Sequence, residues 1–401
     1  MTTLRIEALG AGGDGVAGDG TFVARALPGE VVEGTPTDGR LDAPRIVTPS
    51  PDRVAPPCPH FKRCGGCALQ HAADPLVATW KADRVRTALA QRGLPAEIAG
   101  VATSPPNSRR RAALTGRRTK KGATVGFHVR RSEEVVAIPG CTLLLPQIVE
   151  RLPVLETVAR LAAPRGGSVG LHVTWSDAGL DLVVADAKPA TPDLLAQIAA
   201  LDLARVTWNG EPLLLARAPA RRMGAATVTP PPGAFLQATD HGEAALRAAV
   251  RHATAGATRI ADLFAGIGTF ALPLAATARV DAYEGDRALT CALATGADTA
   301  PSLKPVTATP RDLFRDPLTP AELAPYDAVV IDPPRAGAQA QIAQLADSPV
   351  PTIAHVSCNP ATFARDASAL VDAGYRMGPI AVVDQFRWSP HVELVAPFTR
   401  R

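Results

Sequence analysis

The fold of this chain is decided by the stretch Ile260-Ala261-Asp262-Leu263-Phe264-Ala265-Gly266-Ile267-Gly268-Thr269-Phe270. It begins as a short, nearly continuous apolar run and ends in a turn that contains two glycines. Such a run is typical of a strand buried on both faces of a parallel sheet. Gly266 and Gly268 let the backbone approach a ligand closely, and the helix expected after them begins with free N–H groups. The stretch therefore predicts a strand, a ligand-binding turn and a helix.

The alternation of strand and helix continues to the end of the chain. Further short apolar runs, each ending at a polar or Gly/Pro-rich turn, lie at Val280–Glu284, Ala328–Asp332 and Thr352–Ser357. The last two expected strands, Ile380–Phe386 and Val392–Phe398, have no helix between them and predict an antiparallel hairpin that closes the sheet. Residues 233–401 are therefore expected to form an α/β, Rossmann-like domain with a doubly wound sheet.

Two further units are expected before this domain, because 401 residues exceed what one hydrophobic core accommodates. Short alternating segments around a glycine-dense stretch predict a small OB-type β-barrel over residues 1–52. Residues 53–232 predict a central α+β unit with a cysteine cluster, a helix over Pro75–Arg92 and several strands. Pro230-Pro231-Pro232-Gly233 marks its end.

The composition describes an ordinary globular protein, with 46% hydrophobic and 20% charged residues. A net charge of +4 is too small to indicate nucleic-acid binding by itself. The first residues do not resemble a signal peptide, and no run of about 18 apolar residues suggests a membrane span. We therefore expect a monomer in the reducing cytoplasm, where six cysteines indicate metal ligands, a nucleophile or core residues rather than disulfides.

Acidic residues follow the predicted parallel strands at the edge where ligands bind in open α/β sheets. They are Asp262, Glu284, Asp312 and Asp332. Glu284 lies 18 residues after Gly266, where an acid can accept hydrogen bonds from both ribose hydroxyls. The pattern Gly266-x-Gly268-x-x-Ala271 also fits a NAD site. Asp262 and the run Asp332-Pro333-Pro334-Arg335 favour S-adenosylmethionine.

Cys358 ends the predicted strand Thr352–Ser357, directly before a predicted helix from Ala361 to Ala373. A helix N-terminus lowers the pKa of a thiol, which predicts a nucleophile. The alternative is a small buried hydrophobe, and this interpretation is adopted for Cys291, which lies inside a predicted helix. A thiolate beside a methyl donor is explained by addition to C6 of uracil, which makes C5 nucleophilic. A base must then remove the C5 proton. Glu393 is the candidate, and the alternative is a strand glutamate that faces solvent.

Five stretches, in this order, resemble the RNA 5-methyluridine methyltransferase family, and the resemblance covers nearly the whole chain. They are Phe235-Leu236-Gln237, Asp262–Phe270, Asp332-Pro333-Pro334-Arg335, Ser357-Cys358-Asn359-Pro360 and His391-Val392-Glu393. The resemblance implies that Cys358 is the nucleophile and Glu393 the base. It implies a TRAM-type first domain and a methyltransferase domain over residues 233–401. The cofactor contacts that it implies are Gln237, Phe264, Glu284, Asp312 and Asp332.

A cysteine cluster, Cys58-(x5)-Cys64-Gly65-Gly66-Cys67, has the tight spacing of metal ligands. Cys141 is the plausible fourth ligand outside the C-terminal domain. Zinc and a [4Fe–4S] cluster fit this spacing equally well. The pattern Cys-Gly-Gly-Cys-x-x-Gln-His, which ends at His71, resembles the ribosomal-RNA branch of the family. That resemblance implies a [4Fe–4S] cluster and 23S ribosomal RNA as the substrate, with transfer RNA as the alternative.

A basic region lies between Pro105 and Arg131, with nine Lys or Arg residues and no Asp or Glu. Beside an OB-like domain it predicts salt-dependent contacts to RNA phosphates, and the target base must leave its stack to reach Cys358. Two other classes of protein remain open. One is a NAD-dependent oxidoreductase with an iron–sulfur centre, and the other is a non-catalytic RNA-binding protein that keeps only the fold.

Overall fold

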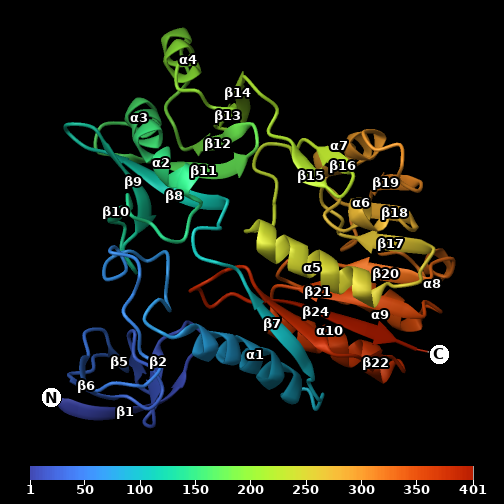
Figure 1. The fold of residues 1–401 in the computed structure, drawn as a ribbon, viewed down its shortest axis with the longest axis horizontal. Coiled ribbons are helices and arrows are strands. Elements are labelled where there is room, and N and C mark those ends of the chain that lie inside the picture. The colour runs from blue at the N-terminus through green and yellow to red at the C-terminus, as the bar shows by residue number, and fades with distance from the viewer. Residues whose placement is uncertain (401) are drawn as a thin grey trace.

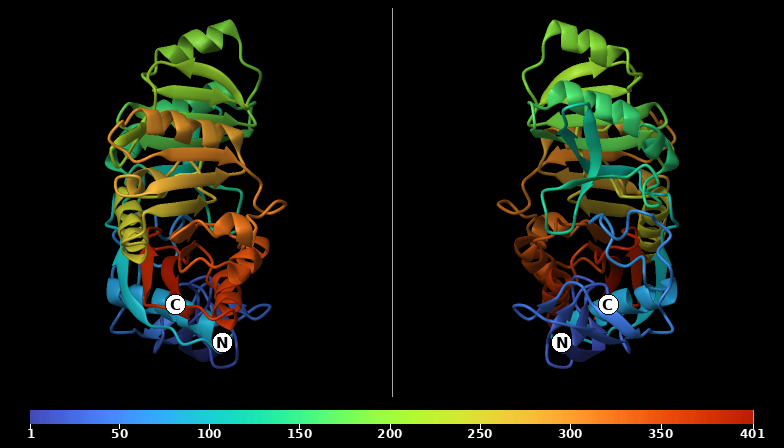
Figure 2. Two further views of the ribbon diagram at one scale, coloured as in Figure 1. Left: turned by 90° about the vertical axis from the view of Figure 1, so that its right-hand side faces the viewer. Right: turned by 90° about the vertical axis from the view of Figure 1, so that its left-hand side faces the viewer.

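The computed structural model describes residues 1–400, which form three units built on separate large sheets (Figure 1). The side views place the N-terminal and central units at opposite ends of the molecule (Figure 2). Within residues 1–400, no helix is both long enough and apolar enough to cross a membrane.

The N-terminal unit is a six-stranded sheet in the order β5-β3-β2-β1-β4-β6. Its strands are β1 (Thr2–Leu9), β2 (Gly15–Ala17), β3 (Phe22–Val23), β4 (Val31–Gly34), β5 (Arg40–Leu41) and β6 (Arg45–Thr48). Successive side chains of β1 point to opposite faces of the sheet, so Leu4 and Ile6 both lie in a small core with Val23 and Val32. The short strands expected here are confirmed. However, β5 and β6 are not paired with each other in this part of the chain, so the hydrogen-bonded sheet does not close into a complete barrel.

The central unit is a seven-stranded sheet in the order β10-β9-β8-β11-β12-β13-β14, packed against helix α3. Its strands are β8 (Arg111–Arg118), β9 (Ala123–His128), β10 (Val135–Ala137), β11 (Ser168–Ser176), β12 (Gly179–Ala185), β13 (Arg205–Trp208) and β14 (Glu211–Leu215). Its helices are α2 (Pro146–Glu150), α3 (Leu152–Ala162) and α4 (Pro192–Ala199). Alternation along β11 buries Val169, Leu171 and Val173 in one core with Leu155 of α3.

The C-terminal unit is a nine-stranded sheet in the order β19-β18-β17-β20-β21-β24-β23-β7, with β22 paired to β24. Its strands are β7 (Ile98–Thr103), β17 (Arg259–Leu263), β18 (Arg279–Glu284), β19 (Val306–Pro310), β20 (Ala328–Ile331), β21 (Thr352–Ser357), β22 (Arg376–Met377), β23 (Ile380–Asp384) and β24 (Glu393–Thr399). The strands from β19 to β21 are parallel, and β24 is antiparallel to both neighbours. The expected parallel sheet and the antiparallel hairpin are confirmed, but the hairpin does not close the sheet, because β7 pairs with β23 at the edge.

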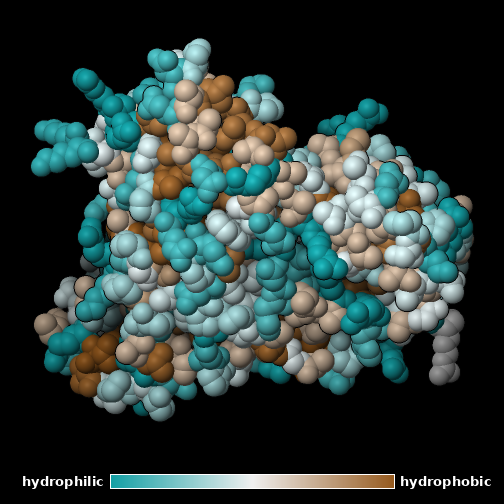
Figure 3. Space-filling view, turned by 45° about the horizontal axis from the view of Figure 1, so that its top comes forward, coloured by the Kyte–Doolittle hydropathy of each residue, from teal (hydrophilic) through white to brown (hydrophobic). Residues whose placement is uncertain are grey.

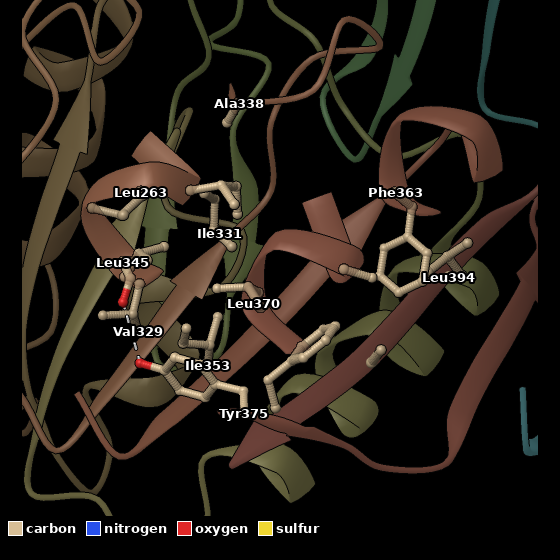
Figure 4. Packing of buried hydrophobic residues seen from close by; sticks show 14 of the residues in the cluster. Leu263, Val329, Ile331, Ala338, Leu345, Ile353, Phe363, Leu370, Tyr375 and Leu394 are labelled. Carbon is tan, nitrogen blue, oxygen red and sulfur yellow. Dashed lines mark hydrogen bonds between the residues drawn. The ribbon is translucent and has the colours of Figure 1, made fainter. Parts of the chain in front are cut away.

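Helices cover both faces of this sheet, so its strands face two separate cores. The helices are α1 (Asp74–Ala90), α5 (Asp240–Ala253), α6 (Ala271–Leu274), α7 (Arg287–Asp298), α8 (Pro320–Leu323), α9 (Gln339–Asp347) and α10 (Pro360–Asp372). One core contains Leu263, Ile331 and Ile353 (Figure 4). Val330 and Val356 point into the other, because successive side chains of a strand alternate between faces. A small hairpin of β15 (Arg221–Met223) and β16 (Ala226–Val228) packs on α7.

The position of α1 and β7 corrects the expected boundaries of the central unit. The helix predicted over Pro75–Arg92 is present as α1, but it packs on α10, and β7 pairs in parallel with β23. Val85 and Leu89 of α1 accordingly lie in the same core as Leu370. Periodicity identified the helix, but the partner of its apolar face is a long-range contact that local sequence does not encode.

The loop before α1, which carries three of the cysteines, contacts all three units. The N–H of Gly65 donates to the carbonyl oxygen of His128 in the central unit at 2.8 Å. The N–H of Leu69 donates to the carbonyl oxygen of Trp388 in the C-terminal unit at 3.0 Å. Leu69 also packs in one cluster with Leu27 of the N-terminal unit. This loop therefore joins the three units close to the segment between β23 and β24.

Candidate active site

The glycine turn after β17 forms as expected at the carboxyl edge of the sheet. Gly266 and Gly268 have positive φ angles of 56° and 92°, which glycine adopts without strain. Phe264 also has a positive φ, 61°, an uncommon conformation for an aromatic residue and one found at ligand sites. The N–H of Gly266 donates to a Glu284 carboxylate oxygen at 3.0 Å. The helix after the turn is shorter than expected, because α6 spans only Ala271–Leu274.

Two carboxyl groups near this turn, those of Asp262 and Asp332, are buried, and burial raises the pKa of each. Asp262 is fully buried, and neither of its carboxylate oxygens has a hydrogen-bond partner in the protein. Burial, and then the charge of Asp332, raise the pKa of Asp262 well above its ordinary value. Burial raises the pKa of Asp332 to about 7. Orphaned buried oxygens fit a ligand that brings hydrogen-bond donors or positive charge to this edge.

An aromatic pair that the sequence analysis missed lies next to the same turn. The rings of Phe264 and Phe314 lie 5.3 Å apart, and Phe314 is 48% exposed although it is large and apolar. Asp312 is nearby, because its carboxylate accepts the N–H of Phe314 at 3.0 Å. A flat heterocycle fits against such rings. The only signal in the sequence was an aromatic residue two positions after Asp312.

Cys358 lies between the end of β21 and the start of α10, as expected, but its thiol is not acidified there. Asn359 caps the helix by accepting the N–H of Ala361. Burial, followed by the charges of Glu393 and Asp332, raises the pKa of Cys358 to about 11. The expectation of a lowered pKa is therefore wrong for the protein without ligands, because desolvation and two carboxylates outweigh the helix N-terminus.

Glu393 is brought beside Cys358 by the pairing of β24 with β21. Ser357 pairs with Leu394, so the next position on each strand places Cys358 beside Glu393. Glu393 is 4% exposed, and burial together with the charge of Asp332 raises its pKa to about 8. Gln237, equally buried, accepts a hydrogen bond from Gln385 at 2.5 Å, directly after β23. The thiol of Cys358, the carboxyl group of Glu393 and the amide of Gln237 therefore lie in one site at the carboxyl edge of the sheet.

The four cysteines expected to bind a metal line one small cavity. They are Cys58, Cys64, Cys67 and Cys141, and apolar side chains including Phe61 and Phe127 surround them. Burial raises the pKa of Cys67 to about 12, and the other three cysteines reinforce this shift. Within residues 1–400, no three His, Cys, Asp or Glu side chains converge closely enough to hold one metal ion. The structure therefore groups the four thiols without forming a single-ion site.

The basic region divides into buried and exposed parts, which corrects its description as one surface. Arg110 has a side chain only 1% exposed and forms ion pairs with Asp240 and Glu243, so it is not available to RNA. The turn between β8 and β9 keeps Lys120 and Lys121 in solvent, and Arg117 near the end of β8 is also exposed. Hydrophilic side chains project from that side of the central unit (Figure 3).

Comparisons with known proteins identify the family. A family model described as tRNA (Uracil-5-)-methyltransferase matches residues 311–400. The chain is 46% identical to a protein of Caulobacter vibrioides named an RNA methyltransferase, over 100% of both chains. It is 36% identical to the 23S rRNA (uracil(1939)-C(5))-methyltransferase RlmD of Halomonas elongata, over 97% of this chain and 88% of that protein. The chain belongs to the RNA (uracil-C5) methyltransferase family.

A solved structure agrees with this assignment at the level of the fold. The tRNA (uracil-54, C5)-methyltransferase of Pyrococcus abyssi, solved with S-adenosyl-L-homocysteine, superposes with a TM-score of 0.78. The match covers 99% of this chain and 100% of that one at 21% identity, so it establishes the fold alone. The protein is thus an RNA uracil-C5 methyltransferase, and its fold and family support S-adenosylmethionine as the methyl donor. The alternatives of a NAD-dependent oxidoreductase and of a non-catalytic RNA-binding protein are not supported.

Proposed function

We propose that the enzyme methylates C5 of one uridine in 23S ribosomal RNA, acting as a cytoplasmic monomer. The observation that carries the proposal is the strand register that brings Cys358 beside Glu393 at the carboxyl edge of the sheet. The Halomonas relative, named for 23S ribosomal RNA, matches nearly the whole chain and favours that substrate. Transfer RNA is the second candidate, because the matching family model is named for it.

The proposed mechanism uses Cys358 as the nucleophile and Glu393 as the base. The Cys358 thiolate adds to C6 of uracil, and C5 gains the electron density to bond to the methyl group. S-adenosylmethionine supplies that methyl group, with its sulfonium sulfur leaving as a neutral thioether. Glu393 then takes the C5 proton, the C5–C6 double bond re-forms, and the bond from Sγ to C6 breaks. The electron pair returns to Cys358, so the enzyme ends as a thiolate and a protonated Glu393.

The charge of the site supports an order of events. In the free protein, a pKa of about 11 keeps the Cys358 thiol protonated at neutral pH. The carboxyl groups of Glu393 and Asp332 contribute to that value. A positive charge bound between them would favour both the carboxylates and the thiolate. Cys358 would therefore become nucleophilic chiefly when the methyl donor is present.

The proposed cofactor contacts all come from the carboxyl edge of the sheet or from the loop before α5. They are Gln237, Phe264, Gly266, Gly268, Glu284, Asp312 and Asp332. The Glu284 carboxylate already accepts a hydrogen bond from the N–H of Gly266 in the turn. From that position it can also accept hydrogen bonds from the ribose hydroxyls. Phe314 is added to this group, because its ring lies against that of Phe264.

We further propose that Cys58, Cys64, Cys67 and Cys141 hold a [4Fe–4S] cluster. The lining of one cavity by all four thiols supports the ligand set. In such a cluster each cysteine sulfur binds a different iron, so four cysteines around one cavity match its ligand number. The backbone N–H of Gly66, 3.4 Å from the Cys64 sulfur, is the kind of donor that such clusters use.

Metal analysis of anaerobically purified protein tests this ligand set. We expect about four iron and four sulfide per chain, bleached by oxidants. Replacing Cys67 with serine should remove most of the iron, whereas replacing the exposed Cys291 should leave the content unchanged. One zinc per chain, with no iron, would contradict the proposal.

RNA is proposed to bind across the units that surround Cys358. The exposed cations of the β8–β9 turn suit phosphate contacts, and the small N-terminal sheet suits an OB/TRAM-like role. Arg109 and Arg111 stack on Phe386 and on the exposed Phe235, at 5.5 and 5.0 Å, and present planar groups close to the site. A uridine flipped from its stack would be held there.

Mapping 5-methyluridine in a deletion strain tests the substrate. We expect one position in 23S ribosomal RNA to lose the modification, and the purified enzyme to restore it on that RNA. Loss from transfer RNA alone, with ribosomal RNA unchanged, would overturn the ribosomal assignment and leave the chemistry intact.

A further inference from the structure

A buried amide that the proposed mechanism does not use lies between its principal residues. Gln385 follows β23 directly and is 1% exposed. Val383 pairs with Glu393 across the β23–β24 ladder. Because side chains two positions apart share a face of a strand, Gln385 is the diagonal neighbour of Glu393 on that face.

The amide of Gln385 makes two hydrogen bonds that fix its orientation. Its oxygen accepts the backbone N–H of Ala238 at 2.7 Å. Its nitrogen donates to the side-chain oxygen of Gln237 at 2.5 Å. An amide nitrogen has two hydrogens, so the second remains for Glu393, whose carboxylate such a hydrogen bond would stabilise. One amide group is thus bonded to Gln237 and lies within the strand register of Glu393.

The surroundings leave Gln385 little freedom to move. A Cβ atom at Gly242, in the first turn of α5, would lie 2.4 Å from the Cβ of Gln385 and 3.3 Å from its side-chain oxygen. Only glycine at position 242 permits this approach. The helix therefore holds the amide against β23, while Ala238 fixes the orientation of its oxygen.

We propose that Gln385 is a positioning residue that joins the base Glu393 to the cofactor contact Gln237 in one hydrogen-bonded unit. This inference rests on the proposed function, because it assumes the roles of Glu393 and Gln237. Gln385 itself touches no reacting atom. It holds the carboxyl group where the C5 proton must be removed, and it fixes the amide of Gln237 toward the cofactor edge.

The charges around Glu393 determine in which direction its pKa should change when Gln385 is replaced. Burial and Asp332 raise the pKa of Glu393, and the hydrogen bond from Gln385 opposes them. Cys358 lies beside Glu393 directly after β21. Glu243 of α5 and Arg110, which precedes β8, are paired with each other. Losing the donor should therefore raise the pKa of Glu393, and the step that needs its carboxylate should move to higher pH.

Release of tritium from RNA labelled at C5 of uridine measures that step. In single turnovers, Gln385→Met and Gln385→Glu should shift the midpoint of the pH profile upward by roughly half to one pH unit, the size expected for one hydrogen bond. Both variants should also weaken S-adenosylmethionine binding several-fold in calorimetry, because Gln237 loses its donor. Gln385→Glu keeps the shape and the acceptor for Ala238 but adds a carboxyl group beside Glu393, so Gln385→Met is the variant that removes the donors without adding a charge.

Gln341 provides the matched control. It is fully buried in the same domain, and its amide bonds only to the backbone of Leu318. Gln341→Met should lower the melting temperature and leave the pH midpoint and cofactor affinity at their wild-type values. Gly242→Ala, which keeps the amide but displaces it, should shift the midpoint as the Gln385 variants do.

Two results would overturn the inference. One is folded Gln385 variants with the wild-type midpoint and cofactor affinity; the other is a Gln341 variant that shifts both equally. If the wild-type enzyme releases no tritium, the proposed function itself fails, which is a different outcome from unchanged variants of an active enzyme.

Discussion

Replacing Cys358 with alanine is expected to abolish methyl transfer while leaving S-adenosylmethionine binding intact. Without the thiolate, C5 of uracil lacks the electron density to take the methyl group, so the rate should fall by at least roughly a thousandfold, about 4 kcal/mol of barrier. The loss should appear as incorporation of labelled methyl groups into RNA. Cofactor affinity, measured by calorimetry, should change little or rise, because the proposed contacts are on other residues and strands.

Cys291→Ala is the matched control for this variant. Cys291 lies on the exposed surface of α7, so its loss should leave both turnover and cofactor binding unchanged. Methylation by the Cys358 variant at a rate near that of the wild type would refute the covalent mechanism. It would do so whatever the substrate RNA proves to be.

The arrangement of the C-terminal sheet could be predicted from sequence because it depends on local signals. The residues 328–331 of β20 are all buried, and a strand hidden on both faces must be apolar throughout. The placement of α1 and β7 could not be predicted in this way. Their pairing with β23 and α10 joins segments nearly 300 positions apart, and periodicity reports the face of an element without naming its partner.

The candidate site shows the same division between local and long-range information. Motifs identified Cys358, Glu393 and the glycine turn, because each needs a residue type at a strand end. The pKa of Cys358 depends on carboxyl groups contributed by two other strands, so the helix N-terminus alone gave the wrong direction. Gln385 was missed for a related reason. A glutamine between an aspartate and a phenylalanine carries no signal until the fold places it between Gln237 and Glu393.

Replacing Glu393 with glutamine is expected to trap the enzyme on its RNA. The amide cannot accept the C5 proton, so the bond from Sγ to C6 persists after methyl transfer, and product release should slow by at least roughly a hundredfold. Losing the carboxylate also removes a charge that raises the pKa of Cys358, so thiolate attack is not impaired. A covalent protein–RNA complex should therefore accumulate and survive on a denaturing gel.

The double variant Cys358→Ala with Glu393→Gln is the control for the identity of this complex. It should form none, because the sulfur that makes the bond is absent. Methylated RNA released by Glu393→Gln at the wild-type rate, with no complex on the gel, would show that another group takes the proton. The carboxyl group of Asp332, with a pKa near 7 and a charge that already acts on Glu393, would then be the residue to replace next. Trapping by Glu393→Gln but not by Asp332→Asn distinguishes the two acids, since only the base leaves a methylated adduct when it is lost.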